Sequence, residues 1–579
     1  MAAIHLVLIP GVCGLLLVAG TSSAAQSPDV AQRCANITQA MQGQWPDPST
    51  RIVSANFRPD GALTAPTATP GPPAAAVPLP GHCEIMGVLQ ERMGMDGRAY
   101  AIRFHVRLPE AWNERLLFQG GGGSDGVIGD ALGPTRSPAL GGPVAAARGF
   151  AVVSEDSGHD NATDSDPRFA GPAAFGFDAE ARENFGHAAL KSVTDAAKAL
   201  LGVYYGKRPH WSYFEGCSKG GQEALAVAER YPADFDGIVA GAPGLSLPRA
   251  AIAEAWDTQT YGAENKVPGA SLNVNQLATS FSDADLKLVA AAVLSACDAD
   301  DGVIDGMVGD FEKCTAARVH PQLQQRTCEG GKQDSCLTPM QVAALLRAFG
   351  GPRDSRGASL YSEWPWDPGI TAPGWRMWKL GTAGGLPSIN VVLGAGALAS
   401  IFTTPPTAVS SAPQALLDFL MAFDFDRDAP KIYATHAQFP RSAWSDISMR
   451  STDFRAFYAH GGKLLIYQGA ADPVFSLNDT VSWFQDVQRR SGTSARAFTR
   501  LFAVPGMSHC NGGPATDQFD ALGALTQWVE QGQAPERIAA SAGKSSPWPG
   551  RTRPLCPYPK IARYTGKGDI ERAENFQCR

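Results

Sequence analysis

One serine lies in a short pattern that is typical of a catalytic nucleophile. Residues 216–220 read GCSKG and fit the spacing G-x-S-x-G around Ser218. Small residues at these positions allow the sharp, strained turn between a strand and a helix that exposes such a serine. The flanks agree, because 212–215 is strand-like and 222–230 has helical periodicity. The alternative interpretation is a glycine-rich surface turn without chemistry.

A second match to the same pattern, GGSDG at 122–126, follows the strand-like run 115–119. A stretch rich in Gly and Pro comes after it, where a nucleophile would need a helix. We therefore interpret it as a loop whose backbone N–H groups approach a substrate carbonyl oxygen. A phosphate-binding loop is disfavoured because no Gly-Lys-Ser/Thr follows.

The order serine, acid, histidine along the chain directs the search for the two partners of Ser218. Asp472 follows the strand-like run 464–468 and is the predicted acid, with Asp479 as the second choice. Such an acid fixes the tautomer of the histidine and stabilises its protonated ring.

Three of the ten histidines lie after residue 435. His436 lies in a region of different character, and His460 precedes its strand, which is the wrong end for catalysis. His509 follows the strand-like run 498–504 and is the predicted base, which takes the serine proton and returns it to the leaving alcohol. The alternative is a structural histidine.

Two cysteines adjoin these residues: Cys217 precedes Ser218, and Cys510 follows His509. If the serine and the histidine are in hydrogen-bond contact, these cysteines could reach disulfide distance. The alternative is that each of them pairs elsewhere.

Composition and charge exclude several classes of protein. The 579 residues are 44% hydrophobic and 18% charged, which is typical of a globular chain rather than a disordered one. A formal net charge of -7 leaves no basic surplus for nucleic acid. Neither C-x-x-C nor H-E-x-x-H occurs, which disfavours zinc ribbons, thioredoxin-like motifs and the common zinc proteases.

Residues 1–25 are predicted to be a signal peptide, because an apolar stretch ends in small residues that suit cleavage before Gln26. The alternative is a membrane anchor, for which the stretch is short. Apart from Cys13 in this segment, ten cysteines remain. An even number behind a secretion signal predicts a disulfide framework and a secreted or periplasmic protein, with no membrane association after cleavage.

Strand-like and helical runs alternate along much of the chain, which predicts an α/β fold with a parallel sheet. The predicted strands are 100–107, 115–119, 150–155, 212–215, 236–240, 463–468 and 498–504, and the predicted helices are 188–205, 222–230, 283–295, 338–349, 480–490 and 519–531. Between 245 and 450 strand signals are few. We therefore expect one core, formed by 26–244 and 451–579, that is interrupted by a lid domain at 245–450.

The Cys-Ser, Asp and His-Cys constellation resembles the tannase/feruloyl esterase family of α/β hydrolases, and the resemblance covers nearly all of the mature chain. The matching runs are HCE at 82–84, GHDN at 158–161, AGAPG at 240–244, FSDADL at 281–286 and TRPLCPYP at 552–559. The resemblance implies an α/β-hydrolase core with a large inserted lid, and a serine carboxylic-ester hydrolase that uses Ser218, His509 and Asp472 without an organic cofactor. It also implies an oxyanion hole from the backbone N–H groups of Gly123 and Lys219, as acyl transfer requires.

The resemblance further implies a disulfide connectivity, which the sequence alone leaves open. The implied pairs are Cys34–Cys83, Cys217–Cys510, Cys297–Cys314, Cys328–Cys336 and Cys556–Cys578.

An acidic stretch within the expected lid, 298–305, holds four carboxylates in eight residues. Its spacing does not match an EF-hand loop, so the residues alone leave open a Ca²⁺ site or a solvated acidic turn. The resemblance favours a structural Ca²⁺ site. The implied ligands are the side chains of Asp298, Asp301 and Asp305 and the carbonyl groups of Val303 and Met307.

Three positions match residues that line the aromatic-acid site of a family member acting on a terephthalate monoester: Trp378, Gln468 and Phe475. For the two aromatic residues the alternative is ordinary core packing. The arginine that grips the free carboxylate in that relative aligns nearest to Ile389, and its pocket histidine is replaced by Gln468. Neither residue can supply a bidentate carboxylate clamp.

We therefore expect a broader hydrolase of small aromatic esters, of the feruloyl or galloyl type. The first alternative is an enzyme dedicated to mono(2-hydroxyethyl) terephthalate that releases terephthalate and ethylene glycol, with Arg376 or Lys379 as the gripping cation. The second is a non-catalytic secreted binding protein, against which the intact Ser218, Asp472 and His509 argue.

Overall fold

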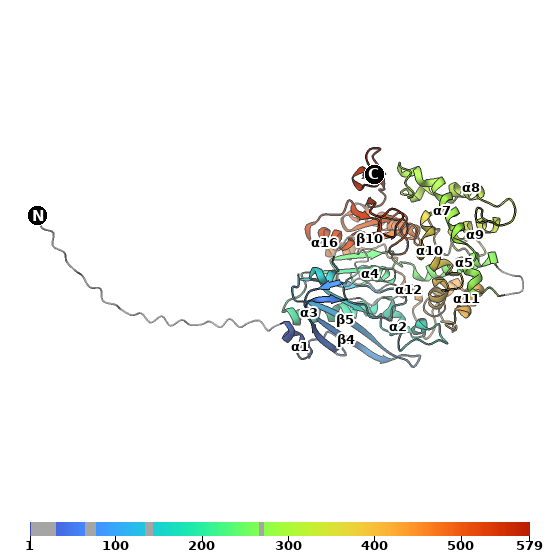
Figure 1. Ribbon diagram of the computed structural model, residues 1–579. Helices are drawn as coiled ribbons and strands as arrows, with labels where there is room; N and C mark the ends of the chain where they lie inside the picture. The colour runs from blue at the N-terminus through green and yellow to red at the C-terminus, as the bar shows by residue number, and fades with distance from the viewer. Residues whose placement is uncertain (2–29, 64–76, 134–142, 266–270) are drawn as a thin grey trace.

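The computed structural model describes Met1 and residues 30–63, 77–133, 143–265 and 271–579. The predicted signal peptide, residues 1–25, lies outside this range except for Met1. The centre of the molecule is a nine-stranded sheet in the order β1-β4-β5-β7-β6-β8-β9-β10-β11 (Figure 1). Its strands are β1 (Arg51–Arg58), β4 (His82–Met93), β5 (Ala99–Pro109), β6 (Arg115–Gln119), β7 (Ala151–Glu155), β8 (Trp211–Cys217), β9 (Gly237–Gly241), β10 (Lys463–Gly469) and β11 (Thr499–Val504).

The strands from β7 to β11 in this order run parallel to their neighbours, and β1, β4 and β5 pair antiparallel. Successive side chains of a strand point to opposite faces of a sheet. In β6, Leu116 and Phe118 pack on one face, and Leu117 packs on the other. Both faces are therefore buried, which explains why the central strands read as nearly continuous apolar runs.

Helices cover both faces of the sheet. One face packs against α1 (Val30–Ala40), α3 (Ala189–Tyr205), α4 (Lys219–Arg230), α13 (Arg455–His460) and α14 (Leu477–Ser491). The other packs against α16 (Ala521–Gln531). The short helices α2 (Ala179–Glu183) and α15 (Ala495–Phe498) complete this part. The expected α/β fold is confirmed, and each predicted strand and helix is present with ends shifted by a few residues.

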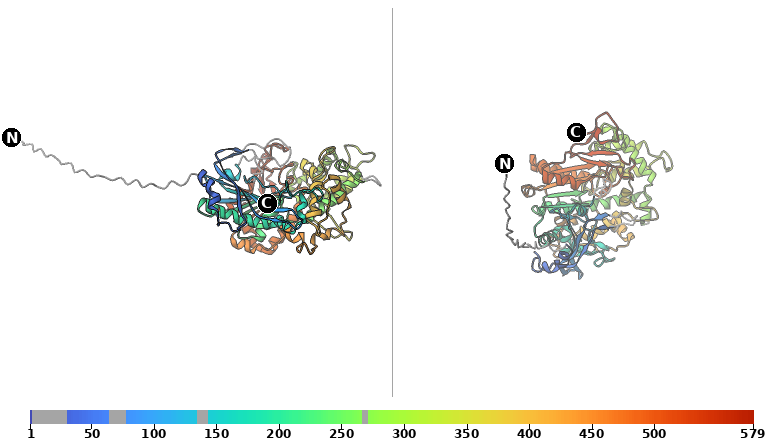
Figure 2. Two further views of the ribbon diagram at one scale, coloured as in Figure 1. Left: turned by 90° about the horizontal axis from the view of Figure 1, so that it is seen from below. Right: turned by 60° about the vertical axis from the view of Figure 1, so that its left-hand side comes forward.

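The chain between β9 and β10 contributes no strand to the sheet in its described residues. It forms α5 (Leu247–Gly262), α6 (Val274–Ala278), α7 (Asp283–Cys297), α8 (Ala316–Gln324), α9 (Pro339–Phe349), α10 (Pro373–Lys379), α11 (Pro413–Ala422) and α12 (Ala443–Ile447). These helices gather at one side of the sheet in both Figure 1 and the left view of Figure 2. The division of the chain into core and lid at 245–450 stays a prediction.

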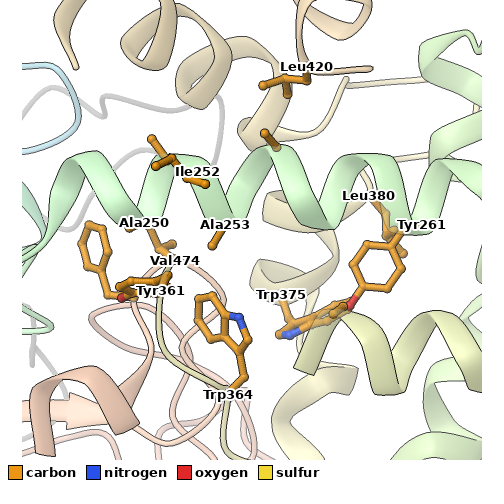
Figure 3. Close-up of a cluster of buried hydrophobic side chains, with 14 of the residues drawn as sticks. Ala250, Ile252, Ala253, Tyr261, Tyr361, Trp364, Trp375, Leu380, Leu420 and Val474 are labelled. Carbon is orange, nitrogen blue, oxygen red and sulfur yellow. The ribbon is translucent and has the colours of Figure 1, made fainter. Parts of the chain in front are cut away.

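The helical insertion has its own apolar core, centred on α5 (Figure 3). Tyr261 of α5 packs edge-on against the ring of Trp375, and Trp364 belongs to the same cluster. Val474 and Phe475, which follow β10, are part of this core as well. The insertion is thus packed directly against the loop that carries Asp472.

The C-terminal segment forms two small ribbons that the sequence patterns did not predict. Strand β12 (Ile538–Ser541) pairs with β13 (Thr552–Leu555), and β14 (Ala562–Tyr564) pairs with β15 (Phe576–Cys578). A further unpredicted ribbon joins β2 (Gly61–Leu63) and β3 (Val77–Leu79). These strands are three or four residues long, which is too short for alternation to be a signal.

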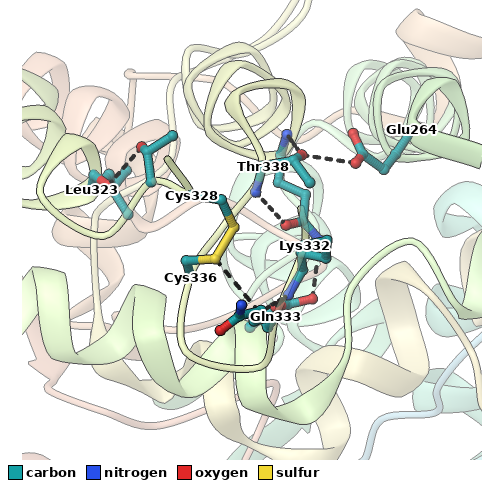
Figure 4. The surroundings of a disulfide bond; sticks show 10 residues. Glu264, Leu323, Cys328, Lys332, Gln333, Cys336 and Thr338 are labelled. Atoms are coloured by element: carbon teal, nitrogen blue, oxygen red, sulfur yellow. Dashed lines mark hydrogen bonds and ion pairs between the residues drawn. A yellow bond between two sulfur atoms is a disulfide. The ribbon is translucent and has the colours of Figure 1, made fainter. Parts of the chain in front are cut away.

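All five expected disulfides are confirmed. The pairs are Cys34–Cys83, Cys217–Cys510, Cys297–Cys314, Cys328–Cys336 and Cys556–Cys578. Figure 4 shows the Cys328–Cys336 bond, which closes a short loop before α9. Among the described residues, no helix combines the length and the apolar character that crossing a bilayer requires.

Candidate active site

Ser218 occupies the turn between β8 and α4, with the backbone at φ +68°. A non-glycine residue in this left-handed region is strained, as at a nucleophile elbow. The neighbouring glycines are sterically required. A Cβ on Gly216 would lie 2.4 Å from the carbonyl oxygen of Gly220, and one on Gly221 would lie 2.3 Å from that of Gly241. The structure thus contains the sharp, strained turn that the G-x-S-x-G pattern predicted, and the small residues are needed to form it.

The acid and the base meet as expected. Nδ1 of His509 lies 3.0 Å from each carboxylate oxygen of Asp472. Oδ1 of Asp472 also accepts the backbone N–H groups of Val474, at 2.8 Å, and Phe475, at 3.2 Å. These donors hold the carboxylate in place, so it can keep the Nδ1–H tautomer of the ring. Asp479, the second choice, instead pairs with Arg450 at 2.6 Å.

The other ring nitrogen of His509 is left with its lone pair. Nε2 is buried and has no hydrogen-bond partner among the described atoms. A buried polar atom without a partner is uncommon, and each case calls for an explanation. If His509 is the base that takes the proton of the serine hydroxyl group, a free lone pair on Nε2 is what it requires, and this would explain the missing partner.

The disulfide Cys217–Cys510 joins the immediate neighbour of Ser218 to the immediate neighbour of His509. The two Cα atoms of this pair are 6.0 Å apart. The two cysteines pack with Ala242 in a small buried cluster of their own. The bond therefore ties the nucleophile turn to the histidine loop.

The glycine-rich loop after β6 lies against the first turn of α4. A Cβ on Gly220 would lie 2.7 Å from the carbonyl oxygen of Gly121. Gly123, at φ +65°, has open space where a side chain would be. The backbone N–H groups of Gly123 and Lys219 donate to no acceptor in the described part of the chain. Both expected donors are thus available to an oxyanion.

Two of the expected substrate-binding residues lie at the histidine. The ring of Trp378 meets the His509 ring edge-on at 5.6 Å between centroids, and the ring of Phe475 does so at 5.4 Å. Gln468 is fully buried, and its amide donates to the carbonyl oxygen of Phe475 at 2.7 Å. It therefore supports Phe475 from behind. Ile389 is half-buried just before the π-helical turn Asn390–Gly394.

The two cations named for a carboxylate clamp are already engaged. Arg376 pairs with Asp283 at 2.7 Å and also donates to two carbonyl groups. Lys379 is buried, lies 4.1 Å from the Trp364 ring centroid and forms an ion pair with Asp257. It lines a small cavity that also borders Asp472. Neither side chain presents a free cation.

The acidic stretch in the insertion contains carboxylates of the kind that bind Ca²⁺, but their side chains do not converge. Asp298 accepts the N–H groups of Asp305 and Gly306, and Asp305 forms an ion pair with Arg553. Burial and the charge of Asp305 raise the pKa of Asp301 to about 7. Among the described residues no three such side chains converge on one point. The Ca²⁺ site stays a prediction.

Two carboxylates near the site, Glu223 and Asp367, were not identified from the sequence. Glu223, one helical turn after Lys219, binds both the Lys219 ammonium group and the N–H of Gly121. The i, i+4 spacing of the two residues was a usable signal. Asp367 accepts the N–H groups of Gly369 and Gly506 and so links the insertion to the histidine loop, and burial raises its pKa to about 6. No local pattern marks Asp367.

A mostly parallel sheet with a serine at the turn between one of its parallel strands, β8, and the following helix α4 defines an α/β hydrolase. The family model for tannase and feruloyl esterase matches residues 83–579. The chain therefore belongs to the tannase and feruloyl esterase family, and it is a carboxylic ester hydrolase.

Curated relatives and solved structures agree with this family. The mono(2-hydroxyethyl) terephthalate hydrolase of Piscinibacter sakaiensis is 41% identical, over 92% of this chain and 89% of its own. A probable feruloyl esterase of Arthroderma benhamiae is 28% identical, over 85% of each chain. The structure of feruloyl esterase B from Aspergillus oryzae has the same fold, with a TM-score of 0.71 at 22% identity, and covers 95% of this chain and 100% of that one.

Proposed function

We propose that this protein hydrolyses esters of aromatic carboxylic acids through a covalent acyl-enzyme on Ser218. The observation that carries the proposal is the Asp472–His509 hydrogen bond, which leaves Nε2 of a buried imidazole without a partner beside the serine turn. This is the arrangement that a serine nucleophile needs from its base.

The reaction follows from these groups. Nε2 of His509 takes the proton of Ser218 as Oγ attacks the ester carbonyl carbon, and Asp472 stabilises the imidazolium that forms. The N–H groups of Gly123 and Lys219 receive the oxyanion. The tetrahedral intermediate expels the alcohol, which takes the proton from Nε2. Water then attacks the acyl-enzyme with His509 again as base, and the acid is released.

The acyl group is aromatic because two aromatic rings flank the base. Trp378 and Phe475 both meet His509 edge-on, and aromatic side chains favour an aromatic ligand in offset or edge-on contact. The relative from Piscinibacter sakaiensis is named for a terephthalate monoester. We propose that the substrates of this protein share with that ester a benzoyl-type ring in the acyl group. We expect neutral phenolic esters of the feruloyl and galloyl type to be preferred here.

A dedicated terephthalate monoester hydrolase is the second candidate, favoured by the identity to that relative. Against it stands the state of the two candidate clamps. Arg376 and Lys379 are each paired with a carboxylate of the chain itself. Gripping a substrate carboxylate would require breaking one of these pairs, and for buried Lys379 that would leave Asp257 unpaired at a large cost.

Secretion or periplasmic export is part of the proposal, supported by five disulfides, which persist in oxidising compartments. A Ca²⁺ ion in the insertion is proposed as well, held by the stretch 298–307. Its role would be structural, and Arg553 now supplies the countercharge to Asp305. No step of the reaction involves it.

The test is a comparison of kcat/KM for methyl ferulate, methyl gallate, methyl benzoate and mono(2-hydroxyethyl) terephthalate. We expect the neutral phenolic esters to exceed the terephthalate monoester by more than ~10-fold, which is about 1.4 kcal/mol. The reverse ranking would establish the second candidate. Ser218→Ala is the control: loss of turnover in that variant would exclude a non-catalytic binding protein, whereas unchanged turnover would show that the chemistry lies elsewhere.

A further inference from the structure

Lys219 contributes more to the site than its backbone. Its side chain is buried, with 1% of its surface exposed. Nζ lies 2.7 Å from Oε1 of Glu223 and 3.8 Å from Oδ1 of Asp125, and 4.5 Å from the ring centroid of Phe185. A buried ammonium group is costly unless it is paired, and here two carboxylates face it.

Both carboxylates also hold the glycine-rich loop. Oε2 of Glu223 accepts the N–H of Gly121 at 2.9 Å, and Oδ2 of Asp125 accepts the N–H of Gly122 at 3.2 Å. The loop is closed tightly over these oxygens, because a Cβ on Gly121 would lie 1.8 Å from Oδ2 of Asp125. The next residue along the loop is Gly123.

The ammonium group is the feature that lets these carboxylates stay together. A third acid, Glu155 at the end of β7, faces the same cluster, and burial together with the neighbouring carboxylates raises the pKa of both Asp125 and Glu155. The same carboxylates raise the pKa of Lys219, so it carries its charge. Without that charge the acids would repel one another across the loop.

From these contacts we infer that the Lys219 side chain, acting through Glu223 and Asp125, positions the Gly121–Gly123 segment so that the Gly123 N–H points at the same oxyanion as the Lys219 N–H. One residue then supplies one donor by its backbone and orients the other by its side chain. The inference rests on the proposed function. Lys219 is a positioning residue in this role, because its ammonium group touches neither substrate nor reacting atoms.

The test is Lys219→Met, which keeps the chain length and removes the charge. Loss of an oxyanion donor lowers kcat by ~10²–10³-fold, and a displaced donor costs less. We expect kcat for methyl benzoate to fall ~10–100-fold with KM changed less than ~3-fold, since the contact acts only in the transition state. Binding of an aryl trifluoromethyl ketone, whose adduct with serine carries an alkoxide, should weaken by the same factor. Binding of benzoate should not change.

Lys198→Met is the matched control. Lys198 is a half-buried lysine that also lies over an aromatic ring, Phe235, at 5.4 Å, but it donates to the carbonyl group of Asp234 and not to a carboxylate of the glycine-rich loop. It should keep its kcat. If Lys219→Met does not fold, Lys219→Met/Glu223→Gln, which removes the paired charges together, replaces it with the same expected losses.

Two outcomes overturn the inference. A folded Lys219 variant with wild-type kcat and wild-type affinity for the ketone would show that the loop holds its own position. Equal losses in ketone and benzoate binding would show a general collapse of the site. Both results leave the proposed function standing, whereas the absence of Ser218-dependent turnover in the wild-type protein would overturn the proposed function and the inference with it.

Discussion

Cys217 and Cys510 are bonded to each other although 293 residues of sequence separate them, with Cα atoms 6.0 Å apart. Each is the immediate neighbour of a residue of the proposed triad. The bond therefore sets the distance between the nucleophile turn, which belongs to the first part of the core, and the histidine loop, which follows the insertion.

Removing this bond should harm both stability and rate. For Cys217→Ala/Cys510→Ala the chain-entropy relation gives a loss of about 6 kcal/mol for so long a loop. We expect kcat to fall at least ~10-fold in the fraction that stays folded, because Nε2 of His509 is no longer held beside Ser218. Urea unfolding and single-turnover kinetics measure the two effects.

The matched control is Cys328→Ala/Cys336→Ala, whose bond closes a loop with a sequence separation of 8 in the insertion (Figure 4). Its removal should cost about 2.5 kcal/mol and leave kcat unchanged. Equal kcat in both double variants would contradict the role given to the Cys217–Cys510 bond.

Asp472→Asn should lower kcat by ~10⁴-fold with KM nearly unchanged, because an amide at this position favours the wrong tautomer of His509. Asp479→Asn is the control, since Asp479 pairs with Arg450 and does not contact the histidine. It should keep kcat within ~3-fold. Steady-state kinetics on methyl benzoate decides, and a larger loss in the Asp479 variant would reverse the assignment of the acid.

Trp378→Leu should reduce kcat/KM for methyl benzoate by ~3–10-fold, the value of about 0.5–1.5 kcal/mol that an aromatic contact carries. Methyl butyrate has no ring to lose, so its kcat/KM should change less. Trp112→Leu is the control, because Trp112 stacks on Tyr205 at 4.1 Å, away from His509. Equal losses for both esters in Trp378→Leu would make this residue ordinary packing.

Added Ca²⁺ should raise the unfolding midpoint of chelator-treated protein. At a Ca²⁺ concentration of 100 times the Kd, the free energy of unfolding should increase by about 2.7 kcal/mol. Mg²⁺ should have a smaller effect, since it prefers a rigid octahedral site. Asp301→Asn should abolish the shift. Asp300→Asn should keep it, because Asp300 lies outside the proposed ligand set and pairs with Arg318. No shift in the wild-type protein would remove calcium from the proposal.

The titration of His187 should cost the folded state stability as the pH falls from about 6.5 to about 4. Burial, aided by the positive charge of Arg230, lowers the pKa of His187 from 6.5 to about 4. The unfolded chain thus binds a proton in this range that the folded state refuses, and the loss amounts to about 3 kcal/mol. His187→Asn, compared with exposed His436→Gln, should flatten the urea midpoint between pH 7 and pH 4. If the urea midpoint of His187→Asn fell with pH as steeply as that of the wild-type protein, His187 would not be the group that titrates.

Local patterns in the sequence were sufficient for seven of the nine strands of the main sheet and for the proposed nucleophile, but they missed β1, β4 and several helices, among them α1 and α5. The turn at Ser218 depends on Gly216, Gly220 and Gly221, which lie within three positions of the serine. Gly216 packs against Gly220, and Gly221 packs against the next strand. Strand and helix periodicity likewise reports which faces are buried. The short C-terminal strands escaped because three or four residues carry no period.

Tertiary structure alone decided what each polar group faces. Asp472 and Asp479 stand seven residues apart, and only the path of the chain after β10 turns the first toward His509 and the second toward Arg450. The same holds for Lys379, a candidate clamp by sequence and the partner of buried Asp257 in the fold. Charges are neutralised by neighbours in space, which sequence distance does not report. The sequence by itself therefore indicated the class of reaction and the proposed nucleophile, and the packing of distant segments decided which of the proposed acids, cations and loop donors remain available for it.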